Sequence, residues 1–424
     1  MSHSFTIKVA VEFTIMITNN IQPNNSTGNN CAVNLAGDPS VLISHPDRSR
    51  GDMCPGALVL HQAEDGAIGR VRFPGGRVLS DQWETIAQIA TELGDGFIHI
   101  TTRGNMQFRG IENQASFLDR VEKAGFLPSR KHDKIRNILA SPLSPQLWEI
   151  TDRLDQALLA NEIVAGLSGR TLFGIDAGNG DIYSHRPDFG VLHQNPGYQV
   201  IMAGELQPLL VTSATDIPDV LVKAAQLWQQ SRGSSWRMRE KPEVVAQIVA
   251  EITKHPAVTA ITATKSATPS LADSRPVGWL SQAVNTGESH VALAAGLRFG
   301  FLSAQVAQVL AAIDKPTSIT PWASLVIHDL DEAEAEAVVR VLAPMGLIFD
   351  HNSPWLRVTA CTGLPGCGKS HSRTRDDAIA MIQSAAIPEG LVHFSGCERR
   401  CGHPLLSHTE YVAVADGEYE VTSR

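Results

Sequence analysis

Apolar residues recur at helical spacing just after residue 80, and two short apolar runs follow. The segment 81–93, DQWETIAQIATEL, has apolar residues at intervals of three and four, which predicts a helix with one buried face. The runs FIHI (97–100) and MQFRGI (106–111) predict two strands joined by a turn at 101–105. With VRFPGG (71–76) ahead of them, this order is typical of α+β domains. The apolar positions of the predicted helix are Trp83, Ile86, Ala87, Ile89, Ala90 and Leu93.

The same order of elements returns after residue 297. LRFGFLSAQVAQVLAAI resembles the earlier helix region, and ITPWASLVIHDL takes the place of HITTRGNMQFRGI, with Pro321 where the first copy has Arg103. A second pair of similar segments, RNILASPL (136–143) and RVTACTGL (357–364), follows at nearly the same spacing. Two matches at nearly one spacing predict an internal duplication, in which each half is a small α+β unit followed by a larger one.

The predicted organisation is an N-terminal arm followed by four folded regions of the α+β class. Residues 19–52 are rich in Asn, Ser, Pro and Gly, so we expect a mobile arm over residues 1–52. The predicted boundaries of the folded regions are 53–118 and 286–349 for the two small units, and 119–285 and 350–424 for the two larger ones.

Composition and charge narrow the class of protein. A chain of 424 residues with 43% hydrophobic and 19% charged residues is typical of a soluble protein with two to four domains. The net charge of −9 disfavours non-specific nucleic-acid binding, which needs a basic surface. No apolar run is long enough for a membrane span, and the first residues lack the features of a secretory signal. We therefore expect a cytoplasmic protein with neither nucleic-acid nor membrane partners.

Four of the six cysteines lie close to the C-terminal end, and the other two are Cys31 and Cys54. The four follow the pattern C-x5-C and C-x3-C, separated by 29 residues. Clustered thiols in a large cytoplasmic protein indicate metal rather than disulfides. Four thiolates from two loops can hold a [4Fe–4S] cluster. Zinc is the main alternative metal, although the two cysteines of a zinc-binding pair are usually closer together in the sequence. The other alternative is that the cysteines are buried and bind no metal.

The segment 363–370, GLPGCGKS, matches the phosphate-binding pattern G-x-x-x-x-G-K-[ST] letter for letter. A strand in WLRVTA and a helix in DDAIAMIQSAA would suit a nucleotide-binding loop. However, only 55 residues follow Lys369, too few for the remaining strands of such a sheet. Because Cys367 lies inside the loop, we interpret its glycines as allowing the backbone to wrap closely around a metal cluster and its neighbour.

Several motifs together resemble the assimilatory nitrite and sulfite reductase superfamily, over nearly the whole chain after residue 52. They are TTRGNMQFRGI (101–111), VRFPGG (71–76), the C-x5-C pair and GCERRC (396–401). The resemblance implies a duplicated architecture of two ferredoxin-like half-domains and two larger α+β domains around a pseudo-twofold axis. It also implies a [4Fe–4S] cluster whose last cysteine bridges, in the reductases, to a sirohaem iron. The implied ligands are Cys361, Cys367, Cys397 and Cys401.

Some segments look more like an oxygen-using branch of this superfamily, which acts in aerobic cobalamin biosynthesis. They are MCPGAL (53–58), ITPW (319–322), SPWLRVTACTG (353–363) and HFSGCERRCGHP (393–404). The last segment ends in His403-Pro404, where the reductases usually have Arg-Pro. The reductases also carry a Lys-x-Lys pair, and here Arg170 and Leu172 take the two lysine positions. Reducing a small oxyanion needs several cations, so the loss of one weakens the interpretation as a reductase.

The resemblance places a set of polar residues at the wall that lines the tetrapyrrole or anion site. Guanidinium groups suit this wall because the substrate of the oxygen-using branch, precorrin-3A, carries many carboxylates. Any one of these arginines alone would fit a solvated surface equally well. The set is Arg72, Arg103, Arg109, Arg136 and Arg170, with Asn105 and Gln107 as neutral hydrogen-bonding groups. Because Pro321 replaces Arg103 in the second half, we expect the corresponding wall there to hold the cluster.

The resemblance implies a monooxygenase that inserts one oxygen atom of O2 into precorrin-3A and closes a lactone. Electrons would pass from NADH or a reductase partner through the [4Fe–4S] cluster to a mononuclear non-haem iron. No catalytic residue is assigned, and no ligand of that iron, although His371, His393 and His403 lie near the cysteines. Two alternatives stay open: a sirohaem-dependent nitrite or sulfite reductase, and a non-catalytic protein that binds a tetrapyrrole or carries a cluster.

Overall fold

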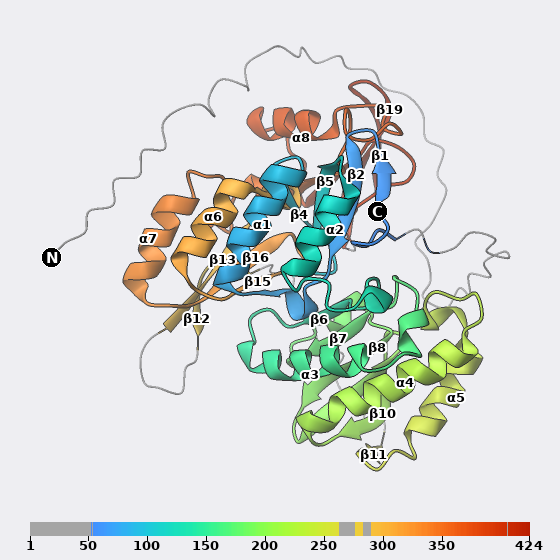
Figure 1. The fold of residues 1–424 in the computed structure, drawn as a ribbon. Helices are drawn as coiled ribbons and strands as arrows, with labels where there is room; N and C mark the ends of the chain where they lie inside the picture. Colours follow the sequence, from blue (N-terminus) through green and yellow to red (C-terminus); the bar gives the residue numbers. More distant parts are fainter. Residues whose placement is uncertain (1–51, 53, 263–275, 283–289, 405) are drawn as a thin grey trace. The chain divides into compact units, whose positions relative to one another are not determined.

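The computed structural model describes residues 52, 54–262, 276–282, 290–404 and 406–424 (Figure 1). The chain divides into a unit at Met1–Val41 and a larger unit at Leu42–Arg424, and every described residue belongs to the larger one. The predicted N-terminal arm, including Cys31, lies outside the described residues apart from Asp52. None of the described helices combines the length and apolar character needed to cross a bilayer.

The first predicted half-domain is a five-stranded sheet with two helices. The periodic segment forms α1 (Ser80–Leu93), which buries Trp83 and Ile86, and the two predicted strands form as expected. The sheet order is β1 (His61–Ala63), β2 (Gly66–Val71), β5 (Met106–Ile111), β4 (Phe97–Ile100) and β14 (Phe301–Ser303), and the second helix is α2 (Gln114–Lys123).

The second half-domain repeats this plan with elements from later in the chain. Its sheet order is β12 (Gly278–Gln282), β13 (His290–Gly296), β16 (Ser324–Leu330), β15 (Thr317–Ile319) and β3 (Arg77–Val78), and its helices are α6 (Ala304–Ile313) and α7 (Glu332–Leu342). Strand β12 precedes the predicted boundary at residue 286 but pairs along its length with β13.

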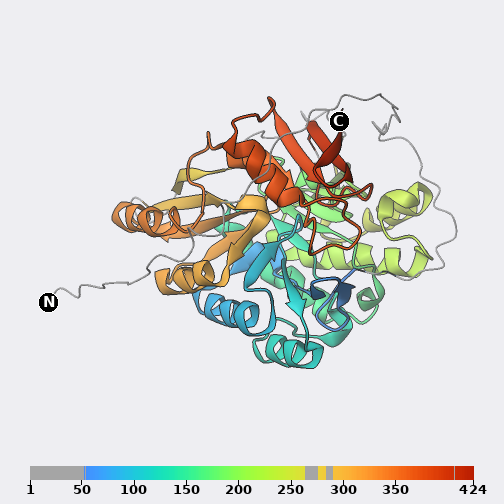
Figure 2. The ribbon, with the colours of Figure 1, turned by 90° about the horizontal axis from the view of Figure 1, so that it is seen from above.

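The two half-domains exchange edge strands. Strand β14 of the second half pairs with β4, and β3 of the first half pairs with β15. Helices α1 and α6 pack against each other beside this exchange (Figures 1 and 2). The buried apolar residues of both halves form one continuous core, which includes Trp83 and Leu325. Each sheet is therefore completed by the other half.

The two larger regions have different sheets. The first has the order β11 (Val258–Ala260), β10 (Glu205–Val211), β9 (Gly197–Met202), β8 (Phe189–Gln194), β7 (Phe173–Asp176) and β6 (Ile138–Ala140), with helices α3 (Trp148–Leu159), α4 (Ile217–Ser231) and α5 (Pro242–Ile252). The second has β17 (Val358–Ala360), β18 (Leu391–Ser395), β19 (His408–Ala415) and β20 (Glu418–Ser423), with helix α8 (Thr374–Gln383). Both contain parallel pairs, β6–β7–β8 and β17–β18–β19.

Equivalent turns in the two halves correct one detail of the predicted alignment. The amide of Thr101 donates to the carbonyl of Asn105 at 2.9 Å, and the amide of Thr320 donates to that of Ser324 at 2.8 Å. This equivalence places Trp322, and not Pro321, at the position of Arg103. The sequence comparison placed Pro321 at this position because it matched the two turns by residue similarity and not by their backbone hydrogen bonds. The duplicated α+β class itself is confirmed.

One hydrogen bond across the strand exchange offers a test of the shared core. The indole Nε1 of buried Trp83 donates to Thr317 Oγ1 at 2.9 Å, and that hydroxyl donates to the carbonyl of Val78 at 3.2 Å. Replacing Thr317 with Val leaves the buried indole donor unpaired, so we expect the free energy of unfolding to fall by about 1–3 kcal/mol. Denaturant unfolding measures this change, with Thr422→Val on exposed β20 as the control. Equal stability of the two variants would contradict the importance of this bond.

Candidate functional site

The four C-terminal cysteines lie on two loops at one edge of the β17–β18 pair. Cys361 follows β17 directly and Cys397 follows β18 by one residue, and these strands are parallel, so their carboxyl ends meet. The amide of Cys361 donates to the carbonyl of Phe394 at 2.9 Å, and the amide of Gly396 donates to Cys361 Sγ at 3.1 Å. Parallel pairing therefore brings the C-x5-C and C-x3-C segments together.

The thiols of the four cysteines are free and lie within electrostatic reach of one another. Burial raises the pKa of Cys401, and the neighbouring Cys361, Cys397 and Cys367 raise it further. Among the described residues, no three or more His, Cys, Asp or Glu side chains are placed to hold a single metal ion. A cubane cluster separates its four ligands, one at each iron corner, so this donor set suits a [4Fe–4S] cluster better than one zinc ion.

Each cysteine loop is anchored by an ion pair. Arg109 binds Asp65 and the carbonyl of Gly366 in the first loop. In the second loop, Arg400 contacts the buried carboxylate of Glu410 at 3.1 Å, and Arg424 contacts the same carboxylate oxygen at 2.7 Å. Charged partners outside the loops therefore hold both cysteine segments in place.

The glycines of the segment 363–370 allow close contact with protein rather than with a phosphate. A Cβ atom on Gly366 would lie 2.9 Å from Asp65 Oδ2, and one on Gly368 would lie 2.5 Å from Glu64 Oε1. Two carboxylates therefore face the loop where a phosphate-binding loop would need positive potential. In addition, α8 begins only at Thr374, outside the segment. Gly363 has a positive φ of 68°, and a Cβ atom there would lie 2.8 Å from the amide nitrogen of Thr374, so the fold itself favours glycine at this position.

The three histidines near the cysteines do not form a ligand set. His371 is exposed, and its amide donates to the carbonyl of Gly396. The Nδ1 atom of buried His393 lies 2.8 Å from Thr359 Oγ1, and that of His403 lies 2.9 Å from the carbonyl of Pro404. Burial, together with the nearby His408 and His403, lowers the pKa of His393 to about 3, so this ring is neutral. His371, His393 and His403 therefore do not form a set of three ligands for a second iron among the described residues.

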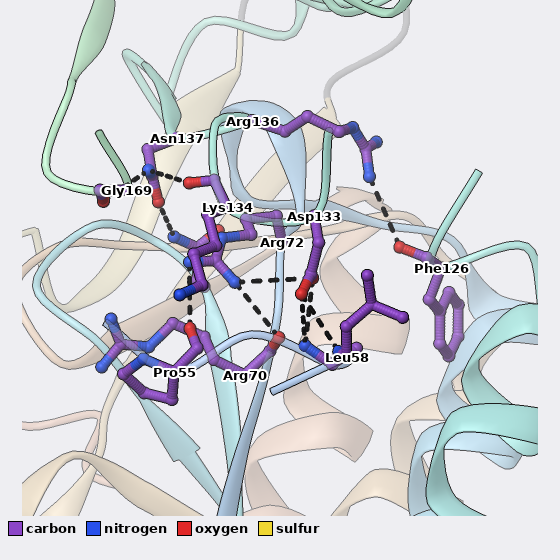
Figure 3. Close-up of polar contacts among 12 residues, drawn as sticks. Pro55, Leu58, Arg70, Arg72, Phe126, Asp133, Lys134, Arg136, Asn137 and Gly169 are labelled. Carbon is purple, nitrogen blue, oxygen red and sulfur yellow. Dashed lines mark hydrogen bonds and ion pairs between the residues drawn. The ribbon is translucent and has the colours of Figure 1, made fainter. Parts of the chain in front are cut away.

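Arg72 is buried and bonded within the protein (Figure 3). Its guanidinium donates to the carbonyls of Pro55 at 3.1 Å and Arg70 at 3.3 Å, and it lies 3.9 Å from the carboxylate of Asp133. Burial, followed by repulsion from Arg70, lowers its pKa to about 10. The group is still charged at neutral pH, and it holds the segment around Pro55 against β2.

Four arginines, Arg70, Arg72, Arg103 and Arg170, lie within electrostatic reach of the Cys54 thiol, as does the carboxylate of Asp52. A fifth arginine, Arg237, repels Arg103. Burial, followed by this repulsion, lowers the pKa of Arg103 to about 10. Such a concentration of positive charge suits a ligand with several carboxylates.

Each of these arginines is oriented by a different contact. Arg103 Nη1 donates to the carbonyl of Gly169 at 2.9 Å, and Arg70 Nη2 donates to Gln107 Oε1 at 3.0 Å. The Arg170 guanidinium lies 4.5 Å from the ring centroid of Trp236, and Arg237 Nε lies 2.7 Å from Asp188 Oδ2. Arg70 lies two residues before Arg72, which was predicted as a site residue, so this spacing could have revealed Arg70. No sequence signal marked Arg237.

The other predicted site residues take different positions. Asn105 is buried, accepting from the amide of Phe73 at 3.1 Å and donating to Asn137 Oδ1 at 3.1 Å. Arg136 forms a bidentate pair with Asp155, at 2.7 Å for both bonds, and Arg109 forms one with Asp65. The structure thus separates Arg109 and Arg136 from the arginines around Cys54, and their role in substrate binding stays a prediction.

The second half has an apolar pocket where the first half has arginines. Gly76 and Gly300 occupy equivalent turns, which makes Gly296 the counterpart of Arg72. The pocket is lined by Gly296, Phe299, Trp322, Trp355 and Val358, among others. Leu172, at the second lysine position of the reductases, is also buried, against Leu139 and Ile182. At the two positions equivalent to Arg72 and Arg103, the second half therefore has Gly296 and Trp322 in place of arginines, although Arg298 stacks on Trp355 of the same pocket.

Comparison with known proteins defines the class. Residues 61–121 match the nitrite/sulfite reductase ferredoxin-like half domain. The solved structure of the Mycobacterium tuberculosis NirA protein superposes with a TM-score of 0.65 at 18% identity, covering 84% of this chain and 73% of that one. The chain therefore contains this half domain at residues 61–121 and shares its fold with the NirA protein over most of its length.

One named relative aligns over most of the chain. It is a precorrin-3B synthase from Sinorhizobium sp, 24% identical over 425 residues, which covers 91% of this chain and 85% of the relative. Shorter matches are a ferredoxin–nitrite reductase of Leptolyngbya laminosa and the sulfite reductase [NADPH] hemoprotein beta-component of Chromohalobacter salexigens. The first is 38% identical over 79 residues (18% of this chain, 16% of the relative), and the second is 31% identical over 99 residues (21% and 17%).

The cysteine assignment predicts which thiols are needed for a cluster. Replacing Cys361, Cys367, Cys397 or Cys401 with Ala should abolish brown absorbance and lower stability, because binding at such a site is coupled to folding. Iron and sulfide analysis after anaerobic purification measures the loss. Cys54→Ala is the control and should retain the cluster, because Cys54 lies among the arginines. A cluster retained in two or more of the four variants would contradict the assignment.

Proposed function

We propose that the protein is a precorrin-3B synthase, a monooxygenase that converts precorrin-3A to precorrin-3B with O2 in aerobic cobalamin biosynthesis. The observation that carries this proposal is the group of arginines around Cys54, which suits a large polycarboxylate. Similarity to the Sinorhizobium synthase over 91% of the chain supports it. The proposal includes a cytoplasmic location and electron delivery from NADH or a reductase partner.

The arginines would bind the substrate through its carboxylate side chains. Arg103, Arg170 and Arg237 come from three separate segments, so their guanidinium groups can meet carboxylates spread over a wide macrocycle. Gln107 helps to orient Arg70, and Asp188 orients Arg237. Because these groups are already fixed by protein contacts, less side-chain entropy is lost when the substrate binds.

The four C-terminal cysteines would hold a [4Fe–4S] cluster, which would supply electrons one at a time. Such a supply is needed because closed-shell organic molecules react only slowly with O2. In the overall reaction one oxygen atom enters the macrocycle and the other leaves as water. Two electrons from the donor and two protons balance the change. No step is assigned to a second iron, because no group of three or more ligand side chains is placed to hold one among the described residues.

The second candidate function is a sirohaem-dependent nitrite or sulfite reductase. The match of residues 61–121 to the reductase half-domain and the local similarity to two reductases favour it. Against it stands buried Leu172, which leaves the anion site one cation short of the reductase pattern. Sirohaem belongs to this alternative alone, and its strong absorption bands would reveal it.

Substrate affinity tests the arginine group. Arg103→Ala and Arg170→Ala should each retain the cluster and weaken tetrapyrrole binding about 10- to 100-fold, the equivalent of one charge-assisted bond of ~1.5–3 kcal/mol. Fluorescence or calorimetric titration with the tetrapyrrole measures the dissociation constant. The control is Arg340→Ala, which removes only an exposed pair with Glu336 on α7. Unchanged affinity in both test variants would remove these arginines from the site.

Isotope labelling tests the reaction. The reduced protein, given precorrin-3A and labelled O2, should form a product heavier by one labelled oxygen atom, detected by mass spectrometry. Nitrite and sulfite should be poor substrates with the same donor, because the site without a cation at Leu172 stabilises a small oxyanion less well. Rapid reduction of either anion, with no label in the macrocycle, would establish the reductase alternative instead.

A further inference from the structure

The first half-domain reaches the first cysteine loop through the turn between β1 and β2. Glu64 and Asp65 form the tip of this turn, and their carboxylates lie against Gly368 and Gly366. A side chain at either glycine would displace one of these exposed carboxylates. The turn therefore packs closely against the loop that carries Cys361 and Cys367.

Arg109 connects this turn to the loop. Its Nε and Nη2 atoms donate to the two oxygens of Asp65 at 2.8 Å each, and Nη2 also donates to the carbonyl of Gly366 at 2.7 Å. The Arg109 side chain is only 7% exposed. A planar guanidinium held at both carboxylate oxygens has little freedom, so the Gly366 carbonyl next to Cys367 is fixed from outside its own loop.

Arg109 is one of several charges on this side of Cys361. Arg375, at the start of α8, stacks 4.6 Å from the ring centroid of Phe301, and its Nε atom has no hydrogen-bonding partner among the described residues. Burial lowers the pKa of Arg375, and repulsion from Arg109 lowers it further, whereas Cys361 has the opposite effect. Asp95, paired with His99 at 3.1 Å, is another carboxylate within electrostatic reach of Arg375. Arg109 thus contributes a fixed positive charge close to the thiols.

The same strand also leads to the substrate arginines. Gln107 and Arg109 are two residues apart on β5, beside the irregular pairing of this strand with β2. Gln107 accepts from Arg70, and Arg109 binds the cysteine loop. Strand β5 therefore joins the two parts of the candidate site.

We propose that Arg109, held by Asp65, is a positioning residue that fixes the Cys361–Cys367 loop and sets the reduction potential of its cluster, in place of a substrate contact. The inference rests on the proposed iron–sulfur function. A nearby cation stabilises the reduced, more negative cluster, and a nearby carboxylate destabilises it.

The proposal predicts shifts of opposite sign in two variants. Arg109→Gln should lower the midpoint potential, and Asp65→Asn should raise it. Each shift should be on the order of a tenfold change in the one-electron equilibrium, or about 59 mV. Arg109→Lys retains the charge and should stay closer to the wild-type potential than Arg109→Gln. A variant that only loosened the fold would not give this order of midpoint potentials, because the order follows the charge of the substituted side chain.

The experiment is a potentiometric titration of the cluster-loaded protein, followed by absorption and electron paramagnetic resonance. Arg136→Gln is the matched control, because Arg136 makes the same kind of bidentate pair with Asp155 and donates to the carbonyl of Phe126 at 3.4 Å. The control should lose comparable stability without a shift in potential. Hydrogen exchange of residues 362–370 in the metal-free protein should be faster in Arg109→Gln than in the control.

Several outcomes would overturn the inference. Unshifted potentials, or shifts of the same sign in Arg109→Gln and Asp65→Asn, would do so, as would a loss of tetrapyrrole affinity in Arg109→Gln like that in Arg103→Ala. If Arg109→Gln does not retain a cluster, the test rests on the other two variants. Asp65→Asn should then raise the midpoint potential, and Arg109→Lys should stay close to the wild-type potential. A wild-type protein without any cluster would overturn the proposed function as well. A wild-type cluster with unresponsive potentials would overturn this inference alone.

Discussion

The reciprocal exchange of β3 and β14 is the constraint on which the rest of the structure depends. An unpaired sheet edge leaves backbone donors and acceptors without partners, and each half supplies the strand that pairs one edge of the other. The turns at residues 74–76 and 298–300 lead directly into these strands, so both turns are held at the junction. The residues just before them, Arg72 in one half and Gly296 in the other, take their places from this exchange.

The duplicated frame carries different chemistry on its two sides. Arg72 and Arg103 in the first half correspond to Gly296 and Trp322 in the second, which changes a cationic wall into an apolar pocket. The difference lies in side chains, because the equivalent turns retain the same backbone hydrogen bonds. A common frame can therefore hold a charged ligand on one side while the other side packs against β17, the strand that leads to Cys361.

Periodicity and spacing predicted the features that are local in sequence. Helix α1 and strands β4 and β5 follow from apolar spacing, and the pairing of the two cysteine segments follows from motif positions. The exchanged strands are only two and three residues long, too short for a periodic signal. Motifs also could not show that Arg136 pairs with Asp155 or Arg109 with Asp65, because such pairs depend on packing between distant segments. Arg237 lies in no motif and was missed for the same reason.

The contact between Arg109 and Gly366 has a consequence for the order of maturation. Asp65 and Arg109 come from the first third of the chain, and the loop that they hold comes from the last quarter, so the two bonded groups are 257 positions apart. During synthesis the early half-domain has to wait for β14 before its sheet is complete, and the cysteine loop emerges later still. In the proposed function, loading of the cluster is therefore a late event, after long-range docking, and an unfinished chain would expose its thiols to oxidation.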